Sequence, residues 1–98
     1  MSDKPRILLV DDDQDLLHLI RMRLQANGLD VSAVGSAQKA ISELSRYRPH
    51  VVITDLRMPG MDGMALFESI QERFLQLPVI ILTAHGTIPD AVAAVQRG

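Results

Sequence analysis

Acidic side chains follow two short apolar runs, and they are the residues of this sequence best suited to chemistry. Asp55 closes the run at 51–54, and the triplet Asp11–Asp13 follows the run at 6–10. If the two runs are neighbouring parallel strands, these carboxylates meet at one edge of the sheet. Clustered like charges have no packing rationale, because they repel one another once they are removed from water. The cluster therefore predicts a bound cation.

The segment after Asp55 indicates where its strand ends. Pro59 lacks a backbone N–H and Gly60 relaxes the chain, so neither suits a continued strand. Elsewhere, strand-like apolar runs alternate with apolar residues at helical spacing. The predicted strands cover residues 6–10, 30–35, 51–55 and 79–83, and the predicted helices cover residues 14–27, 37–46, 63–74 and a last segment that begins near Pro89.

This alternation of strands and helices, with short connections, predicts an α/β protein with a parallel sheet and helices on both faces. In the flavodoxin-like doubly wound order, 2-1-3-4, ligands bind beyond the carboxyl ends of strands one and three. That order brings Asp11, Asp12 and Asp55 together, with Thr83 at the same end of the fourth strand. The fourth run is continuously apolar, which predicts a strand that is covered on both faces.

Composition narrows the possible functions. The 98 residues make one domain at most, and the absence of cysteine excludes disulfide and zinc–thiolate sites. A net charge of −2 with scattered basic residues predicts no binding of nucleic acid by this segment. The four apolar residues at 7–10 are too few for a signal peptide or a membrane span. We therefore expect a cytoplasmic domain that does not contact a membrane.

Three motifs together resemble the receiver domain of bacterial two-component response regulators. They are the pair Asp11-Asp12, the sequence around Asp55 up to Gly63, and Thr83-Ala84. The segments 56–58 and 80–86 are most similar to receivers of sigma-54-dependent, enhancer-binding transcriptional activators. The resemblance implies a flavodoxin-like fold and a signalling domain that catalyses only its own phosphorylation and dephosphorylation.

The resemblance also implies a role for each site residue. Asp12 and Asp55 would bind Mg²⁺ together with the backbone carbonyl of Arg57, and Asp11 would hold a metal-bound water. Asp55 would accept a phosphoryl group from the phosphohistidine of a sensor histidine kinase. The Thr83 hydroxyl would contact the phosphoryl oxygens and act as a switch, although Thr83 taken alone is an ordinary residue at the end of a strand.

Receivers of this family continue through a fifth strand that carries a Lys-Pro pair, and then through a fifth helix. Neither has a counterpart before Gly98, so residues 1–98 are expected to be a receiver domain that is incomplete at its C-terminus. The partners implied for the full-length protein are the kinase, an output domain that activates transcription, and a second copy in a homo-oligomer.

Two other kinds of site share part of the pattern. Residues 11, 13 and 15 resemble the start of a calcium-binding EF-hand loop, but Leu16 and Met22 occupy positions that need glycine and glutamate. A haloacid-dehalogenase-type phosphatase also places Asp-x-Asp after a strand, yet it needs Thr or Val where Asp15 stands, together with a later lysine. It remains the alternative function. Asp13 and Asp62 are expected to cap helices, and the three histidines are expected to be surface or packing residues, namely His18, His50 and His85.

Overall fold

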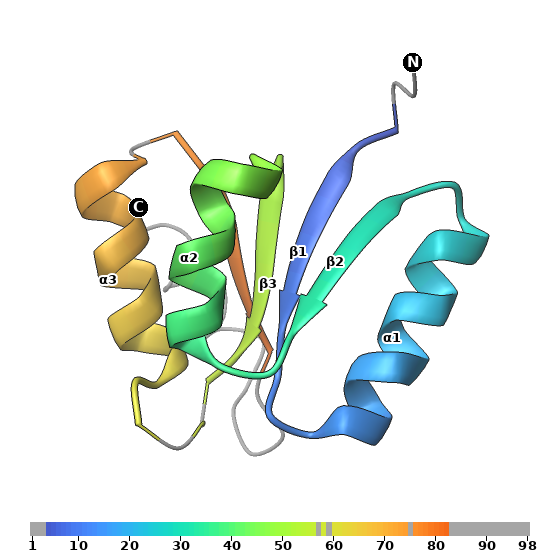
Figure 1. The fold of residues 1–98 in the computed structure, drawn as a ribbon, viewed down its shortest axis with the longest axis horizontal. Coiled ribbons are helices and arrows are strands. Elements are labelled where there is room, and N and C mark those ends of the chain that lie inside the picture. Colours follow the sequence, from blue (N-terminus) through green and yellow to red (C-terminus); the bar gives the residue numbers. More distant parts are fainter. Residues whose placement is uncertain (1–3, 57, 59, 75, 83–98) are drawn as a thin grey trace.

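A computed structural model describes residues 4–56, 58, 60–74 and 76–82, in which four strands alternate with three helices (Figure 1). The elements are β1 (Arg6–Val10), α1 (Gln14–Ala26), β2 (Asp30–Val34), α2 (Ala37–Tyr47), β3 (Val51–Asp55), α3 (Gly63–Arg73) and β4 (Val79–Leu82). The predicted elements agree with these bounds to within a residue or two. The last predicted helix, near Pro89, lies outside the described residues.

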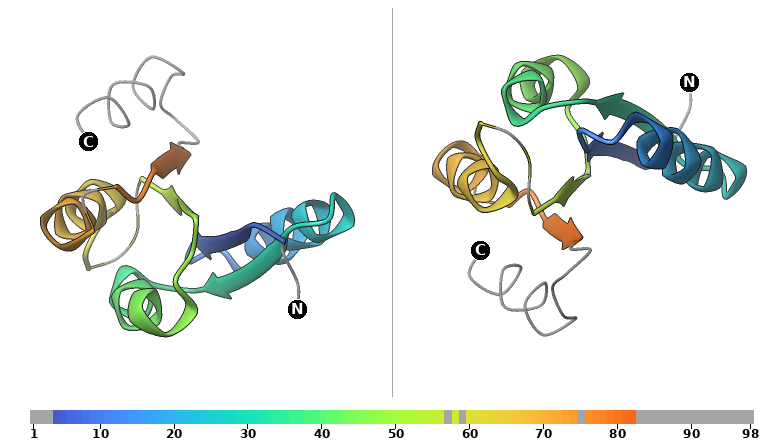
Figure 2. Two further views of the ribbon diagram at one scale, coloured as in Figure 1. Left: turned by 90° about the horizontal axis from the view of Figure 1, so that it is seen from above. Right: turned by 90° about the horizontal axis from the view of Figure 1, so that it is seen from below.

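The four strands form one parallel sheet in the order β2-β1-β3-β4, which is the flavodoxin-like order predicted from the sequence. Helix α1 covers one face, and α2 and α3 cover the other, as the two end-on views of Figure 2 show. Each strand is joined to the next through a helix that crosses a face of the sheet, and the next strand runs parallel to the one before it. All strands therefore present their carboxyl ends at the same edge.

The larger core lies between the sheet and the α2–α3 layer. It is built from alternate strand residues and from the apolar stripes of the two helices, because successive strand side chains point to opposite faces. Its fully buried members include Leu8, Val52 and Ile81 from the strands, with Leu66 and Ile70 from α3. Burial of each of these five side chains stabilises the folded state by roughly 1.5–3 kcal/mol, before the loss of conformational entropy is counted.

The opposite face of β4 corrects one prediction. The continuously apolar sequence predicted burial on both faces, but Ile80 and Leu82 are each 41% exposed, while Val79 and Ile81 are buried. Helix α1 packs on β1 and β2 and does not extend to β4 within the described residues. The outer face of β4 is therefore an apolar surface that none of the described elements covers.

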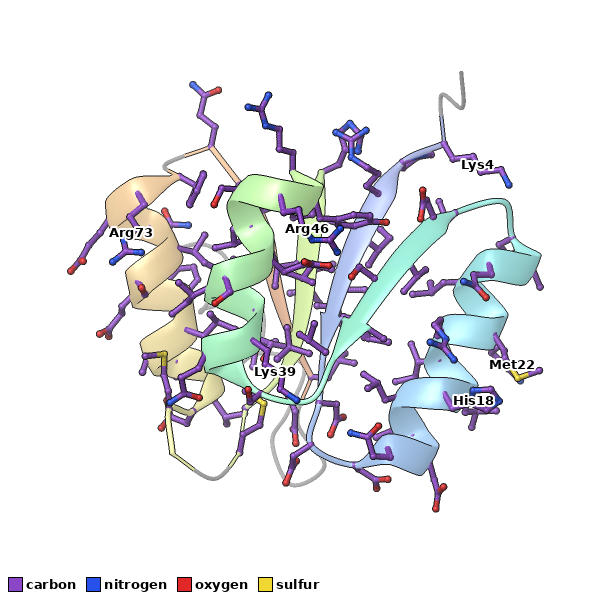
Figure 3. All side chains as sticks on the ribbon, viewed as in Figure 1. Lys4, His18, Met22, Lys39, Arg46 and Arg73 are labelled. Carbon is purple, nitrogen blue, oxygen red and sulfur yellow. The ribbon has the colours of Figure 1, made fainter. Side chains whose placement is uncertain are left out.

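Helix α1 presents a narrow buried stripe to the sheet. Leu17 is buried and Ile20 and Leu24 are half-buried, but Leu16 is 41% exposed. His18 and Met22 lie on the outer side of the helix, away from the sheet (Figure 3). The stripe is narrow because α1 covers only part of its face of the sheet.

Candidate metal centre

Two strand ends bring the predicted acidic residues to one place. Val10 pairs with Thr54 across the β1–β3 ladder, so the residues that follow them in sequence, Asp11 and Asp55, lie side by side at the carboxyl edge of the sheet. Carboxylate oxygens of Asp11, Asp12 and Asp55 all lie within 4.8 Å of one another. The structure thus confirms the predicted convergence of these three side chains.

The three carboxylates differ in their contact with solvent. Asp11 is only 4% exposed, Asp55 is half-buried and Asp12 is exposed. The backbone N–H of Asp13 donates to Oδ1 of Asp11 at 2.9 Å, which fixes the direction of the buried carboxyl group. A gradient from buried to exposed leaves the cluster open to solvent on the side of Asp12.

Burial and neighbouring charges both act on the pKa of the Asp11 carboxyl group. Burial raises the pKa of the Asp11 carboxyl above its usual value, and the negative charges of Asp55, Asp12 and Asp13 raise it further. The hydrogen bond from the Asp13 N–H opposes that rise in pKa. A buried carboxylate surrounded by like charges is costly unless a cation neutralises it.

The oxygen ligands fit a hard divalent cation. Mg²⁺ binds through one or two carboxylates, keeps several waters and takes up phosphate oxygens. Three carboxylates that converge, one of them exposed, would supply such ligands while leaving positions for water and phosphate. Soft or borderline metals favour thiolate and imidazole ligands, and the sequence has no cysteine.

Thr54 and Gly63 contact the backbone of Asp55, and the sequence analysis did not predict these contacts. Thr54 is fully buried, and its hydroxyl donates to the backbone carbonyl of Asp55 at 3.0 Å. Gly63 is buried at the start of α3, where its N–H donates to the carbonyl of Leu56 at 2.8 Å. A Cβ on Gly63 would overlap the carbonyl oxygen of Asp55. The one signal in the sequence is a glycine in the first turn of a predicted helix, where helix propensity disfavours it.

Two other aspartates cap helices, as predicted. Asp13 accepts the N–H groups of Asp15 and Leu16, each at 3.1 Å, and Asp62 accepts the N–H of Ala65 at 2.8 Å. These bonds satisfy N–H groups that have no partner within the helix. Both carboxylates therefore have a structural role that explains their presence.

Some predicted residues fall outside the described part of the chain. Arg57 and Thr83, predicted as a metal ligand and as a switch, are among them, as is His85. Of the other two histidines, His18 is exposed, and His50 accepts the N–H of Arg6 through Nδ1 at 2.9 Å. Neither is in the carboxylate cluster.

Comparison with known families decides what kind of protein carries this cluster. Residues 7–98 match the family described as the response regulator receiver domain. The chain belongs to this family. The carboxylate cluster therefore lies where the strand ends of a receiver domain meet, and the calcium-binding and phosphatase alternatives lose their support.

Receivers of transcriptional regulators are similar along the whole chain. The chain is 52% identical over 99 residues to transcriptional regulatory protein GlrR of Escherichia coli strain K12, and it spans 22% of that protein. It is 46% identical to the C4-dicarboxylate transport transcriptional regulatory protein DctD of Rhizobium meliloti, of which it spans 21%. The chain thus spans about a fifth of these relatives. The resemblance to receivers of sigma-54-dependent regulators is confirmed.

Solved receiver domains share the fold. A response regulator receiver domain protein from Clostridium thermocellum superposes with a TM-score of 0.86 at 31% identity, covering 96% of this chain and 76% of that one. The non-phosphorylated HemR receiver domain from Leptospira biflexa gives 0.85 at 30% identity, covering 97% and 77%. Within the described residues, no helix is both long and apolar enough to cross a membrane.

Proposed function

We propose that this receiver domain accepts a phosphoryl group on Asp55 from the phosphohistidine of a sensor histidine kinase, in a reaction that requires Mg²⁺. One observation carries the proposal: carboxylate oxygens of Asp11, Asp12 and Asp55 lie within 4.8 Å of one another at the carboxyl edge of the sheet. In a receiver domain, such a cluster combines a nucleophile with ligands for the cation that phosphoryl transfer needs.

In the proposed transfer, a carboxylate oxygen of Asp55 attacks the phosphorus. The new P–O bond forms as the P–N bond breaks, and the imidazole nitrogen keeps the electron pair. The product is an acyl phosphate on Asp55 and a histidine without its phosphoryl group. Thr54 and Gly63 hold the backbone of Asp55 during this step, so that its carboxylate stays beside those of Asp11 and Asp12.

The cation would be held by Asp12 and Asp55, by the backbone carbonyl of Arg57 and, through water, by Asp11. Bound Mg²⁺ would offset the negative charge shared by the carboxylates and the incoming phosphoryl group. The raised pKa of Asp11 supports this assignment, because burial and its acidic neighbours leave its negative charge uncompensated among the described residues.

Phosphorylation would switch an output domain elsewhere in the same protein. The curated relatives are transcriptional regulators about five times longer than this chain, which supports transcription activation as the output. The Thr83 hydroxyl would contact the phosphoryl oxygens and transmit the change, and a homo-oligomer would be the active form. We place these events in the cytoplasm, and residues 1–98 would be a receiver domain that continues beyond Gly98.

Intact mass spectrometry tests the proposal. The purified protein is incubated with acetyl phosphate, with and without Mg²⁺, and its mass is measured. We expect one phosphoryl group per chain with Mg²⁺, and no labelling with chelator or in Asp55→Asn. Asp62→Asn is the matched control, because asparagine also caps a helix and the variant should be labelled like wild type.

Two outcomes would overturn the proposal. Labelling that persists in Asp55→Asn would place the acceptor elsewhere, and labelling that ignores chelation would remove the role of the cation. Turnover of a phosphomonoester by the protein would instead support the phosphatase alternative.

A further inference from the structure

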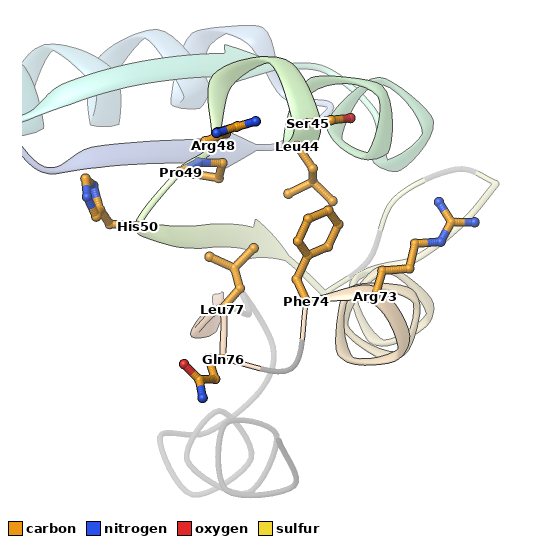
Figure 4. Close-up of a pocket in the computed structure, with 9 residues that line it drawn as sticks. All are labelled: Leu44, Ser45, Arg48, Pro49, His50, Arg73, Phe74, Gln76 and Leu77. Carbon is orange, nitrogen blue, oxygen red and sulfur yellow. The ribbon is translucent and has the colours of Figure 1, made fainter.

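A groove lies at the edge of the sheet opposite the acidic cluster. It occupies about 870 Å³ where α2 and α3 end, next to the start of β3 (Figure 4). Leu44, Phe74 and Leu77 form its apolar floor, and Figure 4 shows the Phe74 ring directed toward Leu44. Phe74 is one of the exposed large hydrophobic residues. The groove therefore offers an apolar surface that solvent reaches.

Basic side chains surround this apolar floor. Arg48 and His50 come from the connection between α2 and β3, and Arg73 comes from the end of α3, so the two positively charged guanidinium groups stand on different sides of the groove. Neither guanidinium has an ion-pair or hydrogen-bond partner among the described residues. Because Nδ1 of His50 accepts the N–H of Arg6, the neutral ring carries its hydrogen on Nε2, which can donate.

Arg48 has a backbone conformation that arginine seldom adopts. It ends α2 with φ 52° and ψ 64°, which is the left-handed region. A residue that ends a helix in this conformation is usually glycine. Of the described residues other than glycine, it alone has a positive φ. Its carbonyl accepts Nε of Arg6 at 2.9 Å, which helps to hold this backbone in place. A strained residue that keeps a long cationic side chain where glycine would fit better points to a use for that side chain.

We propose that this groove binds an acidic segment of a partner protein. An apolar side chain of the segment would cover Leu44, Phe74 and Leu77, and carboxylates on either side of it would pair with Arg48 and Arg73. Charge complementarity favours this ligand, because the cations are separated by the apolar floor and a single small anion would engage only one of them. Guanidinium groups bind carboxylates through paired hydrogen bonds.

The groove and the acidic cluster lie at opposite ends of the strands. None of the groove residues belongs to the carboxylate cluster, so the two sites can be tested separately. Binding at the groove does not depend on phosphorylation. Asp55→Asn should therefore bind the acidic segment as wild type does, whether or not the proposed function holds.

Fluorescence anisotropy with a defined peptide tests the proposal. The probe is a fluorescein-labelled peptide with a central Leu-Leu pair flanked by two glutamates on each side, titrated with the purified protein. A second peptide replaces every glutamate with glutamine. We expect saturable binding of the acidic peptide alone, weakened by rising salt because the charges are exposed.

Variants of the two arginines locate the site. Arg48→Gly relieves the left-handed backbone and should fold at least as well as wild type, yet it should weaken binding about fivefold or more. Arg73→Gln should have a similar effect, and Arg48→Lys should restore part of the affinity. Arg23→Gln, on the exposed side of α1, is the matched control and should bind like wild type. Circular dichroism checks that each variant is folded.

Three results would overturn the proposal. The first is equal binding of the acidic and the neutral peptide. The second is wild-type affinity in both Arg48→Gly and Arg73→Gln. The third is binding to vesicles that contain phosphatidylglycerol with no binding to the peptide, which would make the groove a membrane contact instead.

Discussion

Gly63, the first residue of α3, packs directly against the backbone carbonyl oxygen of Asp55. A Cβ at this position would overlap that oxygen and the Cα of Leu56, which are backbone atoms that cannot rotate away. The Gly63 N–H also donates to the Leu56 carbonyl at 2.8 Å. Glycine here lets the start of α3 reach the end of the strand that carries the proposed phosphoacceptor.

Replacing Gly63 with alanine should therefore disturb both stability and the site. We expect Gly63→Ala to lower the free energy of unfolding by about 1–3 kcal/mol, the usual cost of forcing a methyl group into packed backbone. It should also slow labelling of Asp55 by acetyl phosphate. Urea denaturation and intact mass spectrometry measure the two effects.

Gly28→Ala is the matched control. Gly28 has φ +83°, and no neighbouring side chain or backbone atom lies within 4 Å of the place that a Cβ would take. Alanine would therefore cost about 1 kcal/mol through backbone strain alone. Its labelling should equal that of wild type. If Gly63→Ala matched wild type in stability and labelling, the close packing against Asp55 would have no consequence.

The sequence was sufficient to predict that Asp11, Asp12 and Asp55 converge, because the signals that mark the strand ends are local. Each carboxylate follows an apolar run, so the strand ends could be placed at Asp11 and Asp55 from the pattern alone. Two strand orders are common in doubly wound sheets, and the resemblance to receiver domains selected the flavodoxin-like one. The caps at Asp13 and Asp62 were likewise visible, because capping depends on a residue type at one position.

Features that depend on distant contacts were not predictable. Gly63 meets Asp55 through tertiary packing, which no periodicity encodes. The apolar run of β4 could not reveal that one of its faces stays uncovered at Ile80 and Leu82, because burial depends on which helix reaches the strand. The left-handed backbone at Arg48 was equally hidden, since the sequence there shows only an arginine before a proline.

Asp11 should destabilise the metal-free protein. Burial and the neighbouring carboxylates raise its pKa above the usual 3.8, so its charged form opposes folding. Asp11→Asn should therefore raise the free energy of unfolding by roughly 1 kcal/mol near neutral pH without Mg²⁺. The gain in stability should vanish at pH values below 3.8, where the Asp11 carboxyl group is neutral in both the folded and the unfolded state.

Thermal unfolding with and without Mg²⁺ measures this effect. Wild type should gain stability from Mg²⁺, and Asp11→Asn should gain less, because one of the groups that would hold the cation is gone. Asp15→Asn serves as the control, since this exposed residue of α1 lies outside the cluster. An Asp11→Asn protein that is less stable than wild type without Mg²⁺ would contradict the argument.

Tyr47 provides a pH-dependent signal away from the site. Burial raises the pKa of its hydroxyl above the usual 10, and the bond that the hydroxyl donates to Asp30 at 2.8 Å raises it further. The folded state keeps the proton where the unfolded state loses it. The contribution of the protonated Tyr47 hydroxyl to stability is therefore fully present at pH values below the usual tyrosine pKa. It is lost as the pH rises through the pKa of Tyr47 in the folded state.

The measurement is direct because the sequence has one tyrosine and no tryptophan. Phenolate absorption should appear at higher pH in the native protein than in urea, and Asp30→Asn should shift it back toward the usual value. Identical titrations in the native and unfolded states would show that the bond to Asp30 does not persist in solution.

The uncovered face of β4 should cause self-association of a polypeptide that ends at Gly98. Ile80 and Leu82 are each 41% exposed, and β4 stands at the end of the described sheet. An apolar strand at such an edge is a template for pairing with another chain. Light scattering should therefore show species larger than a monomer that grow with concentration.

A charged residue on this strand should reduce the association. Ile80→Lys is expected to shift the population toward monomer, while Leu19→Lys, on the exposed side of α1, should not. A monodisperse monomer with cooperative unfolding would show that the exposed face of β4 is tolerated and that the edge does not drive pairing.

Thr83 is expected to matter for signalling more than for folding. It follows Leu82, the residue of β4 that pairs with Asp55 in the ladder, and so it is next in sequence to the strand position beside the proposed phosphoacceptor. If its hydroxyl contacts the phosphoryl oxygens, phosphorylation shifts an equilibrium between two existing conformations. Thr83→Ala should thus be labelled on Asp55 yet respond weakly, whereas Thr83→Ser should respond like wild type. NMR spectra of the amides of residues 84–95, recorded before and after phosphorylation, decide the question: equal shifts in wild type and Thr83→Ala would remove the hydroxyl from the switch.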